Sequence, residues 1–235
     1  MMRKLLVMVA IPLMLLVAGP PPASAAGHMP DVPADCAVPP DIDLTLFNVV
    51  IGTNGFDVLR GTNGPDFICG RLGADRIYGY GGDDIILGDT TTFFGNVEAR
   101  GGADVIDAGP GADQVLSGPG NDVVRGGAGD DFIALAVGND TAYGGTGSDG
   151  IIGGFGRDNI LGEAGSDFLA GGFDNDLIDG GAGDDFIAGE LPPDSPPPPG
   201  IDPAPSTNDR CVGGRGVDTA MDCDKLVGIE IESPV

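Results

Sequence analysis

Aspartate recurs every nine residues along most of this 235-residue chain. A first run keeps this interval from Asp57 to Asp84, a second run keeps it from Asp104 to Asp185, and Asp209 and Asp218 form a final pair. The steps between the runs are 20 and 24 residues, which exceed one period by 11 and 15 residues. A fixed short period is the signature of a repeat protein in which each unit packs on its neighbours, so we expect a solenoid.

Two other positions of the nine-residue unit keep step with the aspartate. Glycine lies two residues before it in 14 of the 16 units, with Asp174 and Thr207 as the exceptions, and an apolar residue lies two residues after it in all 16. Such a unit is too short for a helix and predicts a turn followed by a three-residue strand with one inward side chain. Because one unit cannot bury its apolar residue alone, two nine-residue units are expected to form one coil, with parallel strands on two faces and turns along two edges.

The charge of the chain narrows the choice of partner. The formal net charge is −25, with 11 Lys and Arg against 36 Asp and Glu. Nucleic acid is excluded as the main partner, because phosphate binding relies on Lys and Arg. A zinc protease site is excluded as well, because it needs two histidines and His28 is the only one. Cations are therefore the expected ligands.

Stacked coils would place equivalent carboxylates about 4.8 Å apart along each edge. Two unit charges at that spacing repel by roughly 3 kcal/mol at an effective dielectric constant of about 20. Calcium removes this repulsion, since it takes about six to eight oxygen ligands and adjacent turns offer carboxylates and backbone carbonyls, whereas magnesium dehydrates reluctantly. The alternative for an individual aspartate is that it only accepts hydrogen bonds within its turn. The predicted ligands of multiple Ca²⁺ ions are Asp57, Asp66, Asp75, Asp84, Asp104, Asp113, Asp122, Asp131, Asp140, Asp149, Asp158, Asp167, Asp176 and Asp185, with Asp209 and Asp218 as weaker candidates.

Complete copies of the unit, such as residues 126–134 and 180–188, read G-G-x-G-x-D-x-U-x, where U is aliphatic. The chain thus resembles the hemolysin-type, or repeats-in-toxin (RTX), calcium-binding nonapeptide proteins. This resemblance implies an all-β, right-handed parallel β-roll in which the first six residues of each unit form the metal-binding turn. Metal binding is in doubt for the unit of Asp140, which begins Leu135-Ala136-Val137, and for that of Asp176, which has Asp174 in a glycine position.

Two segments interrupt the period. Residues 90–98 admit two interpretations: a degenerate half-coil with a two-residue bulge, or a free loop within 88–100. Residues 192–207 are rich in proline and are expected to form an extended linker. The expected organisation is a signal peptide at 1–25, an N-terminal cap segment at 26–51, a β-roll at 52–191, the linker at 192–207, and terminal repeats with a disulfide cap at 208–235.

The first 25 residues predict that the chain is exported. Residues 1–25 have a basic start, a 14-residue apolar run from Leu5 to Ala18 and small residues at the end, which predicts a secretory signal peptide cut after Ala25 or Ala26. The run is too short to span a bilayer, which takes roughly 20 residues. Secretion permits disulfide bonds, and we expect Cys36 to pair with Cys69 and Cys211 with Cys223, while other pairings stay open.

Two functional hypotheses follow. The first is a secreted, non-enzymatic protein that folds on binding calcium and serves as a scaffold, surface or adhesion protein, with a cell-surface polymer or protein as partner. The second is an exported hydrolase or toxin-related protein, since members of the similar family often carry such domains. The sequence favours the first, because it contains neither G-x-S-x-G with a partner histidine nor HExxH. Rows of Thr and Asn for ice binding are only weakly indicated, by Thr53-Asn54 and Thr62-Asn63.

Overall fold

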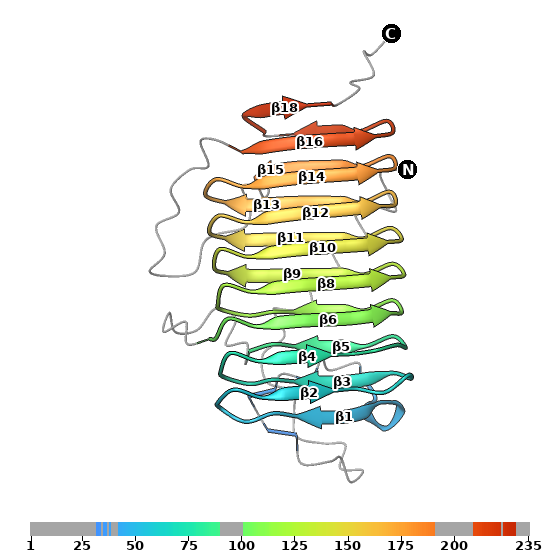
Figure 1. The fold of residues 1–235 in the computed structure, drawn as a ribbon, viewed down its shortest axis with the longest axis vertical. Coiled ribbons are helices and arrows are strands. Elements are labelled where there is room, and N and C mark those ends of the chain that lie inside the picture. Colours follow the sequence, from blue (N-terminus) through green and yellow to red (C-terminus); the bar gives the residue numbers. More distant parts are fainter. Residues whose placement is uncertain are drawn as a thin grey trace.

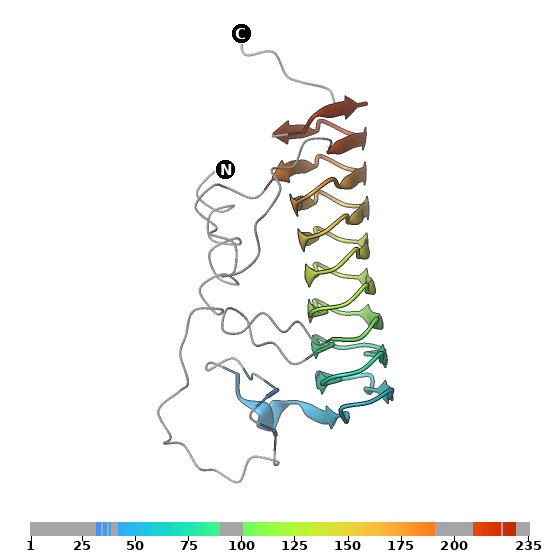
Figure 2. The same cartoon turned by 90° about the vertical axis from the view of Figure 1, so that its left-hand side faces the viewer.

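A computed structural model describes residues 32–33, 35–36, 38, 42–89, 101–190, 209–221 and 223–228. The predicted signal peptide and the whole proline-rich linker at 192–207 lie outside these residues. The described chain forms two nine-stranded parallel sheets that face each other, one built from odd-numbered and one from even-numbered strands. Figure 1 shows the strands stacked in sequence order, and Figure 2 shows the two sheets joined coil by coil. The all-β parallel solenoid expected from the sequence is confirmed.

One short 3₁₀ helix, η1 (Leu44–Leu46), precedes the strands, and none of the helices in the described part is long and apolar enough to cross a membrane. The odd-numbered strands are β1 (Asn48–Ile51), β3 (Asp66–Cys69), β5 (Ile85–Leu87), β7 (Gln114–Leu116), β9 (Phe132–Val137), β11 (Gly150–Phe155), β13 (Phe168–Phe173), β15 (Phe186–Glu190) and β17 (Thr219–Met221). The even-numbered strands are β2 (Val58–Arg60), β4 (Arg76–Tyr78), β6 (Val105–Pro110), β8 (Val123–Ala128), β10 (Thr141–Thr146), β12 (Asn159–Ala164), β14 (Leu177–Ala182), β16 (Arg210–Arg215) and β18 (Lys225–Val227).

Strand register shows how the interruptions are accommodated. Regular neighbours are offset by two periods, as in Ile133 opposite Ile151. Across the first interruption the offset grows to 29 residues, with Arg76 opposite Val105, and across the second it grows to 33, with Leu177 opposite Arg210. The extra residues are therefore inserted within single coils that otherwise keep their register. β4 pairs directly with β6 and β5 directly with β7, which leaves no place for a further half-coil between them, so the interpretation of the insertion as a degenerate half-coil is wrong. Residues 90–98 themselves lie outside the described residues.

The strands in the middle of the stack are longer than expected. From β8 to β14 each strand has six residues and continues through the first three residues of the next unit, as in Val123–Ala128. The expectation of a six-residue turn is wrong for these units, where the turn is shortened to three residues. The leading glycines put no side chains between coils, so Gly127 and Gly145 pair closely and the ladder continues.

The core is one column of inward side chains, one from each half-coil. Residues two places after each aspartate line it, and most are fully buried: Leu59, Ile68, Ile77, Ile86, Ile106, Val115, Val124, Ile133, Ala142, Ile151, Ile160, Leu169, Ile178, Ile187 and Cys211. Ala108 and Leu135, each the first residue of its unit, also join this column. Each coil thus buries its apolar residues only against the coils next to it, as a solenoid requires.

The ladder begins earlier and ends later than the sequence pattern indicated. β1 pairs with β3 so that Asn48 lies opposite Asp66 and Val50 opposite Ile68, which places the start of the roll at residue 48 rather than 52. At the other end β18 pairs with β16, with Lys225 opposite Arg210. This offset of 15 residues is three short of two periods, so the last coil is tighter than the others.

The N-terminal segment packs on the outer face of the odd-numbered sheet. Leu44 and Cys36 are buried there against Phe67, Cys69 and Ile85, and Figure 2 shows the blue segment beside the first coils. A disulfide joins Cys36 to Cys69, with their Cα atoms 6.1 Å apart, and Arg71 pairs with Asp35 at 2.7 Å. A second disulfide joins Cys211 to Cys223 at the far end. The predicted disulfide pairing is confirmed, and each bond fastens one end of the stack.

Core burial predicts the cost of truncating one coil. Ile151→Ala is expected to lower the free energy of unfolding by about 2–5 kcal/mol, because Ile151 is fully buried between adjacent coils. Leu177→Ala is the matched control, since Leu177 is 39% exposed on the outer face, and its expected loss is below about 1 kcal/mol. Urea denaturation in saturating calcium measures both values. Equal losses would contradict the assignment of inward and outward positions.

Candidate metal centre

The in-phase aspartates form two hydrogen-bonded rows, one along each edge of the stack. In each row the backbone N–H of one aspartate donates to Oδ1 of the aspartate one coil further on, as Asp113 does to Asp131 at 2.8 Å and Asp131 to Asp149 at 2.9 Å. The bonds also span the insertions, from Asp75 to Asp104 and from Asp176 to Asp209. The first row holds Asp57, Asp75, Asp104, Asp122, Asp140, Asp158, Asp176 and Asp209; the second holds Asp66, Asp84, Asp113, Asp131, Asp149, Asp167, Asp185 and Asp218.

Three further side chains, at the ends of the rows and at the first insertion, were not predicted from the sequence. Asn48 stands one period before Asp57 and donates from Nδ2 to Asp66 Oδ1 at 2.6 Å, so stepping the period backwards would have found it. Asp224 accepts from the backbone N–H of Asp209 at 3.0 Å, but it lies off the period because the last coil is short. Asp89 is buried beside the first insertion and likewise falls outside the Asp period.

The second carboxylate oxygen of most row aspartates has no hydrogen-bond partner. Within the described residues this holds for a buried Oδ2 atom in each of Asp75, Asp84, Asp104, Asp113, Asp122, Asp131, Asp140, Asp149, Asp158, Asp167, Asp176, Asp185 and Asp218. A buried charged oxygen without a partner lowers the stability of the fold, so each of these atoms needs to bind either a proton or a cation. Their repetition along both edges makes them the strongest chemical feature of the described chain.

Each unpaired oxygen lies in a cradle formed by glycine. At Gly126 an added Cβ would collide with both Asp131 Oδ2 and the carbonyl oxygen of Gly144 in the next coil. The carboxylate of one turn and the carbonyl of the next therefore converge on the space that the missing side chain leaves. The same pair of oxygens converges in the turns of Asp75, Asp84, Asp104, Asp131, Asp149, Asp158, Asp167, Asp176 and Asp185.

Three turns lack this space. Their first residues are Ala108, Ser117 and Leu135, which are all fully buried and belong to the turns of Asp113, Asp122 and Asp140. Ser117 Oγ also donates to the carbonyl oxygen of Leu135 at 2.7 Å, which engages that carbonyl. In the turn of Asp176, by contrast, Asp174 takes the left-handed conformation that glycine normally supplies, with φ of 76°, and the glycine cradle at Gly171 is intact. A side chain at the first position of the turn thus removes the glycine cradle, whereas Asp174 at the fourth position leaves it intact.

Asp57 and Asp66 differ from the rest of their rows. Asp57 Oδ2 accepts hydrogen bonds from the backbone N–H and the Oγ1 hydroxyl of Thr53, at 2.6 and 2.8 Å. Asp66 Oδ2 accepts from the same two groups of Thr62, at 2.6 and 3.2 Å. The Oδ2 atom that is unpaired elsewhere in the rows is therefore hydrogen-bonded in both carboxylates, which is the turn-capping role considered as the alternative to metal binding.

Burial and charge together perturb the row carboxylates. Burial, and next the neighbouring carboxylates, raise the pKa of Asp140 and Asp176 to about 8, while backbone hydrogen bonds oppose the rise. The pKa of Asp104 and of Asp131 rises to about 7, again mainly through burial. An ordinary aspartate would have a pKa of 3.8. The folded chain without metal thus holds protons that the unfolded chain releases.

Side chains alone do not complete a metal site. Across the described residues, no three His, Cys, Asp or Glu side chains converge closely enough to hold an ion. Backbone carbonyl oxygens must therefore supply ligands, as the Gly126 cradle illustrates. A hard cation that accepts carbonyl oxygens, such as calcium, suits this donor set, whereas zinc prefers nitrogen and sulfur.

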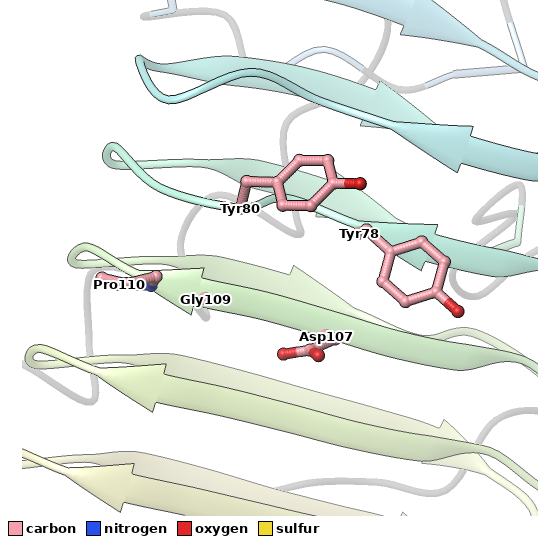
Figure 3. A pocket seen from close by; sticks show the side chains of 5 residues that line it. All are labelled: Tyr78, Tyr80, Asp107, Gly109 and Pro110. Atoms are coloured by element: carbon pink, nitrogen blue, oxygen red, sulfur yellow. The ribbon is translucent and has the colours of Figure 1, made fainter.

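A separate hollow lies on the outer face of the even-numbered sheet (Figure 3). Tyr78, Tyr80, Asp107, Gly109 and Pro110 line it, and the two tyrosine rings have centroids 6.4 Å apart. The exposed Asp107 carboxylate lies on the surface, whereas the row carboxylates are buried. This hollow is therefore distinct from the two rows.

Comparison with known proteins bears on the rows directly. A family model described as the RTX calcium-binding nonapeptide repeat, in four copies, matches residues 51–86, 98–133, 125–160, 136–169 and 161–191. These matches together span more than half of the chain and include the in-phase aspartates from Asp57 to Asp185. They leave out the first three residues of β1 and the coils after the second insertion, which the structure shows to continue the same ladder. No curated protein matches the chain.

The raised pKa values predict that acid stabilises the fold when calcium is absent. The folded-state pKa values of Asp104, Asp131 and Asp140 are about 7, 7 and 8, above the ordinary 3.8, so the folded state binds more protons than the unfolded state between these limits. Stability without calcium should therefore fall as pH rises from about 4 to about 8. Thermal melts in chelator between pH 5 and pH 8, followed by circular dichroism, measure this dependence. A melting temperature that falls on acidification would contradict the assignment.

Proposed function

Because the chain belongs to the RTX calcium-binding nonapeptide repeat family, we propose that it is a non-catalytic protein whose β-roll folds and stiffens on binding several Ca²⁺ ions. The observation that carries the proposal is the regular set of buried, unpaired Oδ2 atoms that face glycine cradles and backbone carbonyl oxygens. Calcium bound there would supply positive charge and further coordination to these oxygens. The chain's own residues provide the carboxylates, the carbonyls and the space.

The ligands divide into three groups. Turns with both an unpaired carboxylate oxygen and a glycine cradle are the proposed calcium sites, and they belong to Asp75, Asp84, Asp104, Asp131, Asp149, Asp158, Asp167, Asp176 and Asp185. A second group has the unpaired carboxylate oxygen but lacks the glycine cradle with its facing carbonyl oxygen; it consists of Asp113, Asp122, Asp140 and Asp218. Asp57 and Asp66, whose Oδ2 atoms are hydrogen-bonded by threonine, are proposed to be structural caps that need no ion.

Calcium binding would couple to folding. Without cations, the rows bring ionised carboxylates together in a poorly solvated position, and proton uptake is the remaining way to relieve them. Binding to the folded state alone adds its free energy to folding by linkage. Since extracellular calcium is generally more abundant than cytosolic calcium, this coupling favours a protein that folds after export.

Secretion and a surface role complete the proposal. The amino-terminal signal pattern of residues 1–25 and the two disulfides both fit an oxidising, extracellular location. A stack of repeated coils stiffened by calcium along both edges would serve as a scaffold or adhesion protein at a cell-surface polymer or protein.

Two substitutions in the second row test the proposed ligands. Asp131→Asn removes a carboxylate with an unpaired oxygen and a cradle, so the variant should bind about one Ca²⁺ ion fewer than the wild type. Asp66→Asn removes the same charge from a carboxylate already paired by Thr62 and should leave the number of ions unchanged. Equilibrium dialysis with radioactive calcium measures ions per folded molecule, and circular dichroism gives the folded fraction.

The comparison is made per folded molecule because Asp66→Asn places an amide beside the Thr62 donors and lowers stability. Equal loss of ions in both variants would count against the division between ligands and caps. A wild-type protein that binds no calcium at millimolar concentration would overturn the proposed function itself.

A further inference from the structure

Asp89 is a buried carboxylate that the nine-residue pattern does not include. It is the second residue of the turn that begins at Gly88 and, after the first insertion, ends at Asp104. In the neighbouring coils of the same edge this second position is held by Arg71 and Gly118 in the left-handed conformation, with φ of 77° and 95°. Asp89 is not among the described residues with positive φ, and its side chain is fully buried.

The local contacts hold the Asp89 side chain inside the turn. Its backbone N–H donates to the carbonyl oxygen of Ser117 at 2.9 Å, and its Oδ2 accepts from the backbone N–H of Gly102 at 3.0 Å. Its Oδ1 has no hydrogen-bond partner within the described part of the chain. One carboxylate oxygen is therefore anchored, and the other is buried and unpaired.

The same turn contains a second carboxylate in the same condition. Asp104 Oδ2 is also unpaired, and it lies beside Gly88 together with the carbonyl oxygen of Ser117. On the other side of the turn, Asp89 Oδ2 and the carbonyl oxygen of Pro119 converge at Gly101. This turn thus gathers two carboxylates and two carbonyl oxygens of the next coil, whereas the regular turns each supply one row carboxylate.

The negative charges around Asp89 are consistent with a cation bound between Asp89 and Asp104. Burial raises the pKa of Asp89 to about 8, and among the neighbouring charges Asp104 contributes most, followed by Asp122 and Asp75. Two carboxylates compensate the charge of a divalent cation fully, and calcium affinity rises with the number of charged ligands. Neutral hydrogen bonding is the competing role for Asp89, and an asparagine of the same shape would preserve it.

We propose that Asp89 and Asp104 hold one calcium ion between them and that this site has the highest calcium affinity in the chain. The inference rests on the proposed calcium-binding function and adds a ligand outside the repeat. Its position is significant, because the coil interrupted by the 11-residue insertion costs more conformational entropy to close than an uninterrupted coil. An ion that fills first there would fix the two ends of the insertion before the weaker sites bind.

Calcium titration of the full chain, three single variants and one double variant tests the proposal. Asp89→Asn should weaken the tightest class of sites by at least about tenfold, because it removes one charge from the ligand set. Asp107→Asn is the matched control: it removes the same charge three residues after Asp104, but from the exposed surface in the hollow of Figure 3, and it should leave this class unchanged. Isothermal titration with Ca²⁺, in protein stripped of metal, measures the affinity.

A double-mutant comparison separates a shared ion from two independent effects. If Asp89 and Asp104 bind the same ion, Asp104→Asn should remove the tight class, and adding Asp89→Asn should have little further effect. Additive losses would overturn the shared site, as would an Asp89→Asn isotherm identical to that of the wild type. If Asp89→Asn fails to fold even in saturating calcium, a purely structural role is indicated and the proposal fails. Absence of calcium binding by the wild type would instead refute the proposed function.

Discussion

The constraint on which the structure depends is the stacking of carboxylates at equivalent positions of successive coils. One oxygen of each carboxylate is used to tie coils together, as in the bond from the Asp113 N–H to Asp131 Oδ1. The other oxygen is buried and unpaired in most turns. The same side chain therefore sets the register of the backbone and creates a need for positive charge, so stability and ligand binding are two consequences of one repeated residue.

The stacking of carboxylates also determines where glycine is needed and where extra residues can be inserted. A side chain at Gly126 would occupy the space in which Asp131 Oδ2 and the Gly144 carbonyl meet, so the cradle exists only where the first residue of the turn lacks a Cβ. The insertions enter between residues of the turn and leave both aspartate rows continuous, as the bond from Asp75 to Asp104 shows. The roll thus tolerates extra residues at its edge, provided that the stacked carboxylates on either side stay in register.

Much of this arrangement could be predicted from the sequence because a period of nine fixes which residues stack. The inward column, the two rows and the parallel sheets all follow from it. Other features depend on tertiary contacts that a period does not encode. The extended six-residue strands arise from close backbone pairing such as Gly127 with Gly145. The pairing of Asp66 by Thr62, and the burial of Asp89 beside the first insertion, depend on how individual side chains turn within a coil. Asp224 was missed because the final coil is shorter than two periods.

Cations at the aspartate rows are proposed to decide whether the chain folds. A calcium titration of the metal-stripped, disulfide-intact protein at pH 8, followed by far-ultraviolet circular dichroism, measures this dependence. At this pH the raised carboxylate pKa values leave protons least able to replace metal. We expect little strand signal in chelator, a cooperative gain of strand on adding calcium, and reversal when chelator is restored. A full strand signal in chelator at pH 8 would show that the roll folds without cations.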